Sequence, residues 1–126
     1  MDTKKVYAFT KENLKKAIRK IQVRIKENIP VEKCEICNAI TERSKDLDTV
    51  LRIAARPNAI KQCPICGRVY LYTYSYEYLV AGASEEDESL SPIEPKQIQI
   101  KINDILSSYV PPKKIIHFGH SWEIDF

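Results

Sequence analysis

The chain has 126 residues, of which 44% are hydrophobic and 29% are charged, a balance typical of one globular domain and not of a disordered segment. No apolar run reaches the roughly 18 residues needed to span a bilayer, and the first residues lack the apolar core of a signal peptide, so we expect a cytoplasmic protein with reduced thiols and no membrane partner. The net charge of +3 is unevenly spread: residues 1–33 hold ten Lys and Arg against four acids, and residues 81–95 hold five acids without a base, which indicates two surfaces of opposite sign.

Residues 10–29 are predicted to form an amphipathic helix that follows a short extended segment at residues 6–9. Thr10 is a suitable N-cap, Pro30 cannot continue a helix, and apolar residues recur at helical spacing at Leu14, Ala17, Ile18, Ile21 and Ile25. The opposite face is basic and carries Lys11, Lys15, Lys16, Arg19, Lys20, Arg24 and Lys26. Such a face is most often simply solvated, but it is also a candidate docking surface for phosphate or an acidic partner.

The four cysteines fall into two Cys-x-x-Cys pairs, Cys34 with Cys37 and Cys63 with Cys66. A two-residue spacer lets both thiolates of a pair reach one metal ion from a tight turn, and zinc prefers four thiolates in a tetrahedron. Gly67 follows the second pair and Asn38 the first, and these residue types best tolerate the left-handed backbone of such a turn. We therefore predict one structural Zn²⁺ ion bound by all four cysteines.

Other uses of the four cysteines are less well supported. Two disulfides need an oxidising compartment, for which the sequence carries no address signal. A thioredoxin-like redox pair opens a helix after a strand, whereas the second pair here runs into a strand. An iron–sulfur cluster has similar ligand chemistry and stays open as an alternative.

Around Cys34-x-x-Cys37 and Cys63-Pro64-x-Cys66-Gly67, the segment 31–72 resembles the zinc-ribbon and rubredoxin-like knuckle class. The resemblance implies a structural metal ion. It implies no single function, because zinc ribbons serve in transcription, translation and protein docking alike. The first knuckle lacks the Pro and the Gly of the second, which departs from a ribbon of two equivalent hairpins.

The two pairs are separated by 25 residues, more than the usual 15–20 of this pattern. Leu47, Val50, Leu51 and Ala54 recur at positions i, i+3, i+4 and i+7. This spacing predicts a helix over residues 44–56, inserted between the knuckles.

Residues 68–80 are predicted to form a strand with an aromatic face. The face consists of five tyrosines at alternate positions, Tyr70, Tyr72, Tyr74, Tyr76 and Tyr78. Packing against a helix or neighbouring strands is the plainest interpretation. An exposed ladder could instead stack the bases of single-stranded nucleic acid or bind a protein. Protein binding is favoured over nucleic acid, because the strand has only Arg68 as a base and also contains Glu77.

An acidic cluster follows the aromatic strand. Ser84 and Asp87 fit a Ser-x-x-acid capping pattern, so we expect a short helical turn or a loop there. Tyrosines and acids together would suit a basic partner surface. The candidate partner-binding residues are therefore Tyr72, Tyr74, Tyr76, Tyr78, Glu85, Glu86, Asp87 and Glu88.

Residues 90–126 are predicted to hold a helix and two short strands. The helix follows Pro95 and its apolar stripe is Ile98, Ile102, Ile105 and Leu106, although residues 98–102 also alternate like a strand. The strands are expected at residues 115–118 and 122–126. His117 and His120 are most simply ordinary strand or turn residues, since a second metal site would need further ligands.

Together these elements predict a single α+β domain over residues 1–126, with a zinc-knuckle core at residues 31–72, an antiparallel Tyr-rich strand and two to three helices. No phosphate loop, nucleophile elbow or His-Glu-x-x-His motif is present, so we expect no enzyme. The favoured hypothesis is a bacterial protein-binding module, either an adaptor or an immunity protein that neutralises a toxin-like partner. The alternative is a nucleic-acid-binding zinc ribbon that uses the basic N-terminal helix.

Overall fold

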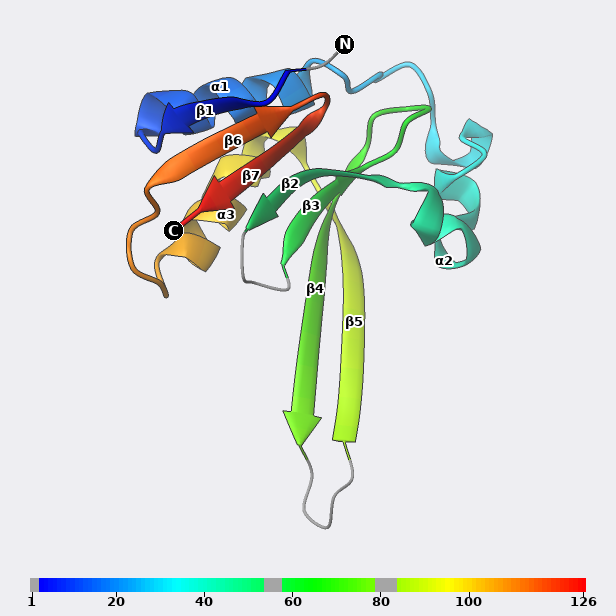
Figure 1. The fold of residues 1–126 in the computed structure, drawn as a ribbon. Coiled ribbons are helices and arrows are strands. Elements are labelled where there is room, and N and C mark those ends of the chain that lie inside the picture. Colours follow the sequence, from blue (N-terminus) through cyan, green and yellow to red (C-terminus); the bar gives the residue numbers. More distant parts are fainter. Residues whose placement is uncertain (1–2, 54–57, 79–83) are drawn as a thin grey trace.

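A computed structural model describes residues 3–53, 58–78 and 84–126. Over these residues the chain forms one α+β domain around a seven-stranded mixed sheet, as predicted (Figure 1). The strands are β1 (Lys5–Ala8), β2 (Asp48–Ile53), β3 (Ala59–Gln62), β4 (Val69–Tyr78), β5 (Ser84–Ile93), β6 (Lys114–Phe118) and β7 (Ser121–Asp125). The α-helices are α1 (Lys11–Gln22), α2 (Ile40–Arg43) and α3 (Ile98–Leu106). Within the described ranges, no helix is long and apolar enough to cross a membrane.

The sheet has the strand order β1-β6-β7-β2-β3-β4-β5. Its neighbours pair antiparallel apart from β2 and β7, which run parallel, with Leu51 opposite Trp122. The helices α1 and α3 lie on one side of the sheet (Figure 1), and their apolar faces form the main core with the inward residues of the strands. This core contains Leu14, Ala17, Ile18, Ile21, Val50, Leu51, Ile53, Ile60, Val69, Ile93, Ile98, Ile102, Ile115, Trp122 and Ile124.

The first helix starts where the sequence predicts and ends earlier. The Oγ1 atom of Thr10 accepts a hydrogen bond from the backbone N–H of Asn13 at 3.0 Å, which confirms Thr10 as the N-cap. The helix ends at Gln22 and not near residue 29. At that point the N–H of Lys26 donates to the carbonyl of Cys66 at 2.8 Å, a partner that a continued helix would replace with Gln22. Contact with the second cysteine pair therefore takes the place of the next helical bond beyond the end of α1.

The predicted helix at residues 44–56 is wrong. A single short turn, Ser44–Asp46, is followed by strand β2, and residues 54–57 lie outside the described residues. The register between β2 and β3 shifts between Thr49 and Leu51, which leaves Val50 as an extra residue in the strand. Val50 and Leu51 are both buried as a result. This bulge produced the apolar spacing that resembled a helix.

The predicted helical turn or loop at the acidic cluster is also wrong. Residues 84–93 form strand β5, which pairs antiparallel with β4 over all ten residues. The predicted Tyr-rich strand is confirmed as β4, and its last two expected residues, 79 and 80, lie outside the described part of the chain. In the C-terminal region, the helix and both strands are confirmed as α3, β6 and β7.

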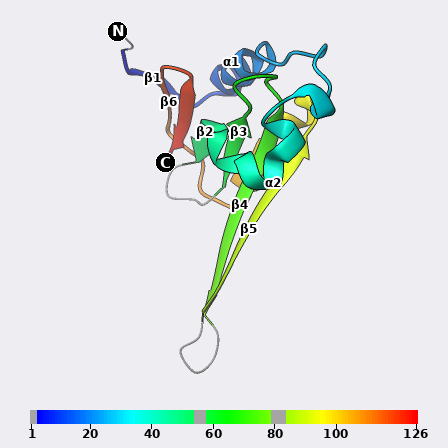
Figure 2. The same ribbon diagram turned by 90° about the vertical axis from the view of Figure 1, so that its right-hand side faces the viewer.

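The hairpin of β4 and β5 projects beyond the rest of the sheet. Pairing between β3 and β4 stops at Ala59 opposite Tyr72, while pairing between β4 and β5 continues to Tyr78 opposite Ser84. Residues 73–78 and 84–89, which we call the arm, therefore extend as a two-stranded ribbon (Figures 1 and 2).

Candidate metal centre

The four cysteines of the two predicted knuckles come together in one buried cluster. Their sulfur atoms all lie within 4.8 Å of one another, and every cysteine is at most 4% exposed. The Sγ atoms of Cys34 and Cys63 are 3.6 Å apart, and those of Cys37 and Cys66 are 3.5 Å apart. Four thiolates at 2.3 Å from a tetrahedral zinc ion would be separated by about 3.8 Å, so the cluster fits a metal ion of this kind. All four are free thiols.

The second knuckle is the turn of a β-hairpin. The N–H of Gly67 donates to the carbonyl of Cys63, and the N–H of Cys63 donates to the carbonyl of Arg68, both at 2.9 Å. Gly67 has a φ of 81°, the left-handed conformation expected for it. A Cβ atom at this position would lie 2.1 Å from the carbonyl oxygen of Arg24. Only glycine therefore allows the knuckle to touch the end of α1.

The first knuckle contains the same hydrogen bond in a different setting. The N–H of Asn38 donates to the carbonyl of Cys34 at 2.8 Å, which matches the bond of Gly67. Asn38 itself belongs to a 3₁₀ helix, Cys37–Ala39, and the chain continues into α2. Asn38 thus has a right-handed backbone and does not use the tolerance that the sequence suggested. The two knuckles are not equivalent hairpins.

A buried glutamine joins the second knuckle to the first helix. Gln62 is completely buried, and its Nε2 atom donates to the carbonyls of Ile21 and Gly67, both at 2.9 Å. Together with the bond from Lys26 to Cys66, these contacts fix one half of the cysteine cluster against α1.

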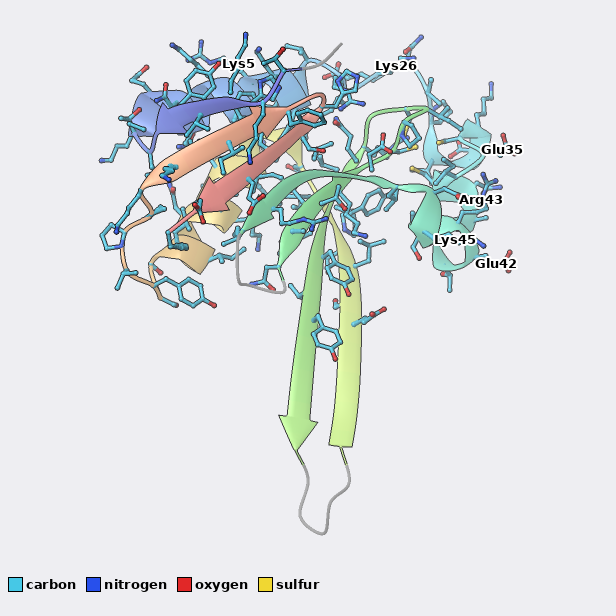
Figure 3. All side chains as sticks on the ribbon, in the orientation of Figure 1. Lys5, Lys26, Glu35, Glu42, Arg43 and Lys45 are labelled. Atoms are coloured by element: carbon cyan, nitrogen blue, oxygen red, sulfur yellow. The ribbon has the colours of Figure 1, made fainter. Side chains whose placement is uncertain are left out.

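A second small core surrounds the sulfur atoms. Ile36, Leu47 and Tyr70 are buried in it, and Ile29, Ile40, Ile65 and Leu90 pack against it. Along β4, Val69 and Leu71 belong to the main core while Tyr70 belongs to this one, so the strand separates the two. In Figure 3 the sulfur atoms lie between this strand region and the segment that carries Glu35 and Arg43.

The hydroxyl of Tyr70 donates to Cys37 Sγ at 3.0 Å, inside the protein. The sequence identified Tyr70 as part of an aromatic ladder but gave no sign of this contact, because it joins residues 33 positions apart. The side chain of Arg68 also interacts with Cys66 and Cys37, and its Nη1 atom is buried without a hydrogen-bond partner. Burial tends to lower the pKa of Arg68, but the thiols of Cys66 and Cys37 outweigh it and hold that pKa above its usual value.

The thiols of the cluster have unequal proton affinities. Burial would raise the pKa of Cys34, but a backbone N–H at Cys37 and the neighbouring thiols lower it to about 7. Burial raises the pKa of Cys37 to about 12 against the hydrogen bond from Tyr70, and burial also raises the pKa of Cys63. A bound metal ion would therefore have to displace protons from at least Cys37 and Cys63.

The predicted partner-binding residues lie apart from the sulfur cluster, along the hairpin. The hydroxyl of Tyr72 donates to Glu88 Oε1 at 3.1 Å, and Lys61 Nζ lies 4.9 Å from the centre of the Tyr72 ring. Tyr74 is half-buried and pairs with Glu88 in the strand register. The backbones of Tyr76, Tyr78, Glu85, Glu86 and Asp87 continue the two strands, and their side chains lie outside what the structure describes.

A hollow of about 510 Å³ lies between α2 and the root of the arm. Its lining includes Lys45, Lys61, Tyr72, Glu88 and Leu90. Cations and an anion are mixed there, so the lining favours no single charge of ligand.

The two histidines lie near the end of the chain and are not part of the cysteine cluster. His117 Nε2 is 2.9 Å from the carbonyl oxygen of Gly119, and its ring stacks on Trp122 with centroids 3.8 Å apart. Over the residues that the structure describes, the four cysteines form the one group of three or more side chains able to hold a metal ion.

The fold and the cysteine cluster together define a small α+β domain with a candidate four-thiolate metal centre. No family model, no curated protein and no solved structure matches this chain.

Proposed function

We propose that this protein is a zinc-stabilised protein-binding module that contacts its partner through the arm. The observation that carries the proposal is the extension of β4 and β5 beyond β3. An isolated two-stranded ribbon is marginally stable in water at best. A ribbon of this length therefore gains order when a partner covers it, and the metal centre holds its root.

The metal is proposed to be one structural Zn²⁺ ion held by Cys34, Cys37, Cys63 and Cys66. Four thiolates favour zinc among common biological cations and leave no open position for a substrate. The ion would supply folding free energy and not catalysis. With every thiol committed to it and His117 bonded to Gly119, we assign the protein no enzymatic activity.

The chemistry of the arm suggests a basic partner surface. Residues 73–78 and 84–89 contain five acids and no Lys or Arg, together with three tyrosines. Tyrosine is enriched at the energetic centres of protein interfaces. Two arms packed together would oppose like charges, which is destabilising, so a second copy of the chain is a poor occupant. A cationic protein surface is complementary to the arm.

In the cell we propose that the module is cytoplasmic and acts either as an adaptor or as an immunity-type neutraliser that covers the basic surface of a toxin-like protein. Toxins that act on nucleic acid carry such surfaces because they must bind phosphates. A neutraliser would protect cells when it is co-expressed with its partner. An adaptor would not.

The test compares two triple variants of the tagged full-length chain in affinity capture with cross-linking. The arm variant carries Glu85→Gln, Glu86→Gln and Asp87→Asn. The matched control carries Glu12→Gln, Glu27→Gln and Glu32→Gln, which removes the same charge from the basic N-terminal part. We expect the wild type and the control to recover one stoichiometric protein that the arm variant loses. Recovery of no such protein, or equal recovery by both variants, contradicts the proposal.

Nucleic acid is a second candidate partner, supported by the surface of α1. The side chains of Lys11, Lys15, Lys16, Arg19 and Lys20 are all exposed. A hollow of about 280 Å³ beside the helix is lined by Lys20, Arg24, His117 and His120, among others. Binding of a single-stranded oligonucleotide should then fall steeply with salt and weaken on Lys15→Gln with Lys16→Gln. No binding at low salt removes this candidate.

A further inference from the structure

Two side chains that are not metal ligands reach the sulfur cluster from the start of β4. Tyr70 is 6% exposed, and its hydroxyl donates to Cys37 Sγ at 3.0 Å. A buried hydroxyl that donates to sulfur stabilises the thiolate more than the thiol, because the negative charge strengthens the bond. The contact therefore fixes the position of the Cys37 sulfur and places a donor beside the negative charge that a metal-bound thiolate carries.

Arg68 follows Cys66 by two residues, and its side chain interacts electrostatically with Cys66 and Cys37. The Nη1 atom of Arg68 is buried without a partner, an arrangement that ordinarily costs free energy. The cost is offset if the guanidinium faces a concentrated negative charge. A four-thiolate metal site beside Arg68 would supply that charge.

A closed four-thiolate site needs such support. Four thiolates around a divalent ion leave a net charge of −2 in a place where all four cysteines are almost inaccessible to water. Charge buried in this way is costly unless donors or cations surround it. Outer contacts of this type typically change metal affinity by about 10- to 100-fold when they are removed.

We propose that Tyr70 and Arg68 are positioning residues of the metal centre: the Tyr70 hydroxyl orients the Cys37 sulfur through its hydrogen bond, and Arg68 offsets the negative charge of a four-thiolate site beside Cys66. Neither residue is a ligand. This inference rests on the proposed zinc site and is independent of the arm; a wild-type protein that binds no Zn²⁺ would remove the proposed site itself, whereas the variants below test only the two outer residues.

The test of Tyr70 uses Tyr70→Phe with Tyr72→Phe as a matched control. Both changes remove one hydroxyl from β4, but the hydroxyl of Tyr72 bonds to Glu88 and not to sulfur. Zn²⁺ affinity is measured by competition with a chromophoric chelator, and the thiolate-to-metal absorption band is recorded with Co²⁺ in place of zinc. Thermal unfolding of both variants with metal bound checks that the fold is kept.

We expect Tyr70→Phe to weaken Zn²⁺ binding on the order of 10-fold. The Co²⁺ band should move to longer wavelength, because the sulfur lone pairs lose a stabilising donor. Tyr72→Phe should change neither. Wild-type affinity with an unshifted band in Tyr70→Phe overturns the role of Tyr70, and so does an equal loss in both variants.

The test of Arg68 separates its charge from its size. Arg68→Gln should weaken Zn²⁺ binding on the order of 10-fold, while Arg68→Lys should retain most of the wild-type affinity because it keeps the charge. Wild-type affinity in Arg68→Gln overturns the role of Arg68. An equal loss in both variants also overturns it, since packing and not charge would then be responsible.

Discussion

The second cysteine knuckle is built into the sheet, whereas the first lies outside it. Cys63 and Cys66 sit in the hairpin between β3 and β4, and backbone bonds tie this turn to the end of α1. Cys34 follows one short 3₁₀ helix, Val31–Lys33, and Cys37 begins another, Cys37–Ala39; the backbone hydrogen bonds of Cys34, Asn38 and Ala39 join residues only three or four positions apart. Backbone hydrogen bonds of the sheet therefore hold the second knuckle in place, whereas the first knuckle is held by the contacts of its sulfur atoms and apolar side chains. A bound metal ion would stabilise the first knuckle far more than the second.

Removal of the metal should have the largest effect on stability. The first knuckle should unfold while the second knuckle stays folded. Structural zinc contributes about 10–16 kcal/mol of apparent free energy in small zinc-binding folds. With chelator and reductant present, we expect amides of residues 31–46 to lose protection from hydrogen exchange first. Amides of β3 and β4 should stay protected. Simultaneous loss in both regions would show that the hairpin knuckle also depends on the ion.

Addition of a methyl group at Gly67, the glycine of the second knuckle, should cause the next largest loss of stability. Gly67→Ala is expected to cost about 3 kcal/mol or more, because it combines a left-handed backbone with a clash against the Arg24 carbonyl. Asn38→Ala is the matched change in the first knuckle, where the side chain is exposed and the backbone is right-handed, so its effect should be small. Denaturant unfolding of the two metal-bound variants measures the difference. Equal losses would mean that the knuckles are more alike than their geometry suggests.

The glutamine that joins the second knuckle to α1 should give an intermediate effect. Gln62→Leu leaves the buried carbonyl of Gly67 without its donor and removes one of the hydrogen bonds to the carbonyl of Ile21, which is expected to cost about 1–3 kcal/mol. Gln22→Leu is the control, since Gln22 also donates to a carbonyl, that of Pro95, but lies at the surface. The melting temperature of Gln62→Leu should be lower than that of Gln22→Leu. The reverse order would show that the hydrogen bonds of Gln62 do not stabilise the contact between the second knuckle and α1.

The smallest loss of stability is expected from a change in the surface ion pairs of the first knuckle. Arg43 forms ion pairs with Asp46 and Glu35 there; Figure 3 labels Arg43 and Glu35 on this segment. Exposed ion pairs contribute little and are screened by salt. Arg43→Ala should lower the melting temperature slightly at low salt and not at high salt. A large loss that persists at high salt would show that Arg43 supports the knuckle by packing.

The cysteine cluster could be predicted from the sequence because its information is local. The Cys-x-x-Cys spacing and Gly67 determine the ligand set and the turn of the second knuckle without reference to the rest of the chain. The outer contact from Tyr70 could not be predicted in the same way. This contact depends on the packing of the first knuckle against β4, and no periodic pattern of residues in the sequence predicts that packing.

The fold class was predictable, while two elements were misassigned for distinct reasons. In β2 a bulge turned Val50 and Leu51 inward together, and the resulting spacing imitated a helix. In β5 the acids have low strand propensity and follow a capping pattern, but pairing with the strongly strand-forming β4 decided the outcome. Both errors arise where tertiary pairing overrides local preference.

The parallel pair of β2 and β7 has a consequence for how the chain folds. Leu51 meets Trp122 across roughly seventy intervening residues, so the two parts of the sheet stay separate until this long loop closes. The β4–β5 hairpin and the β6–β7 hairpin need only short loops and can form early. Docking of β7 against β2 is therefore the step expected to limit the folding rate, and substitutions at Trp122 should slow folding more than equally destabilising ones in the β4–β5 hairpin.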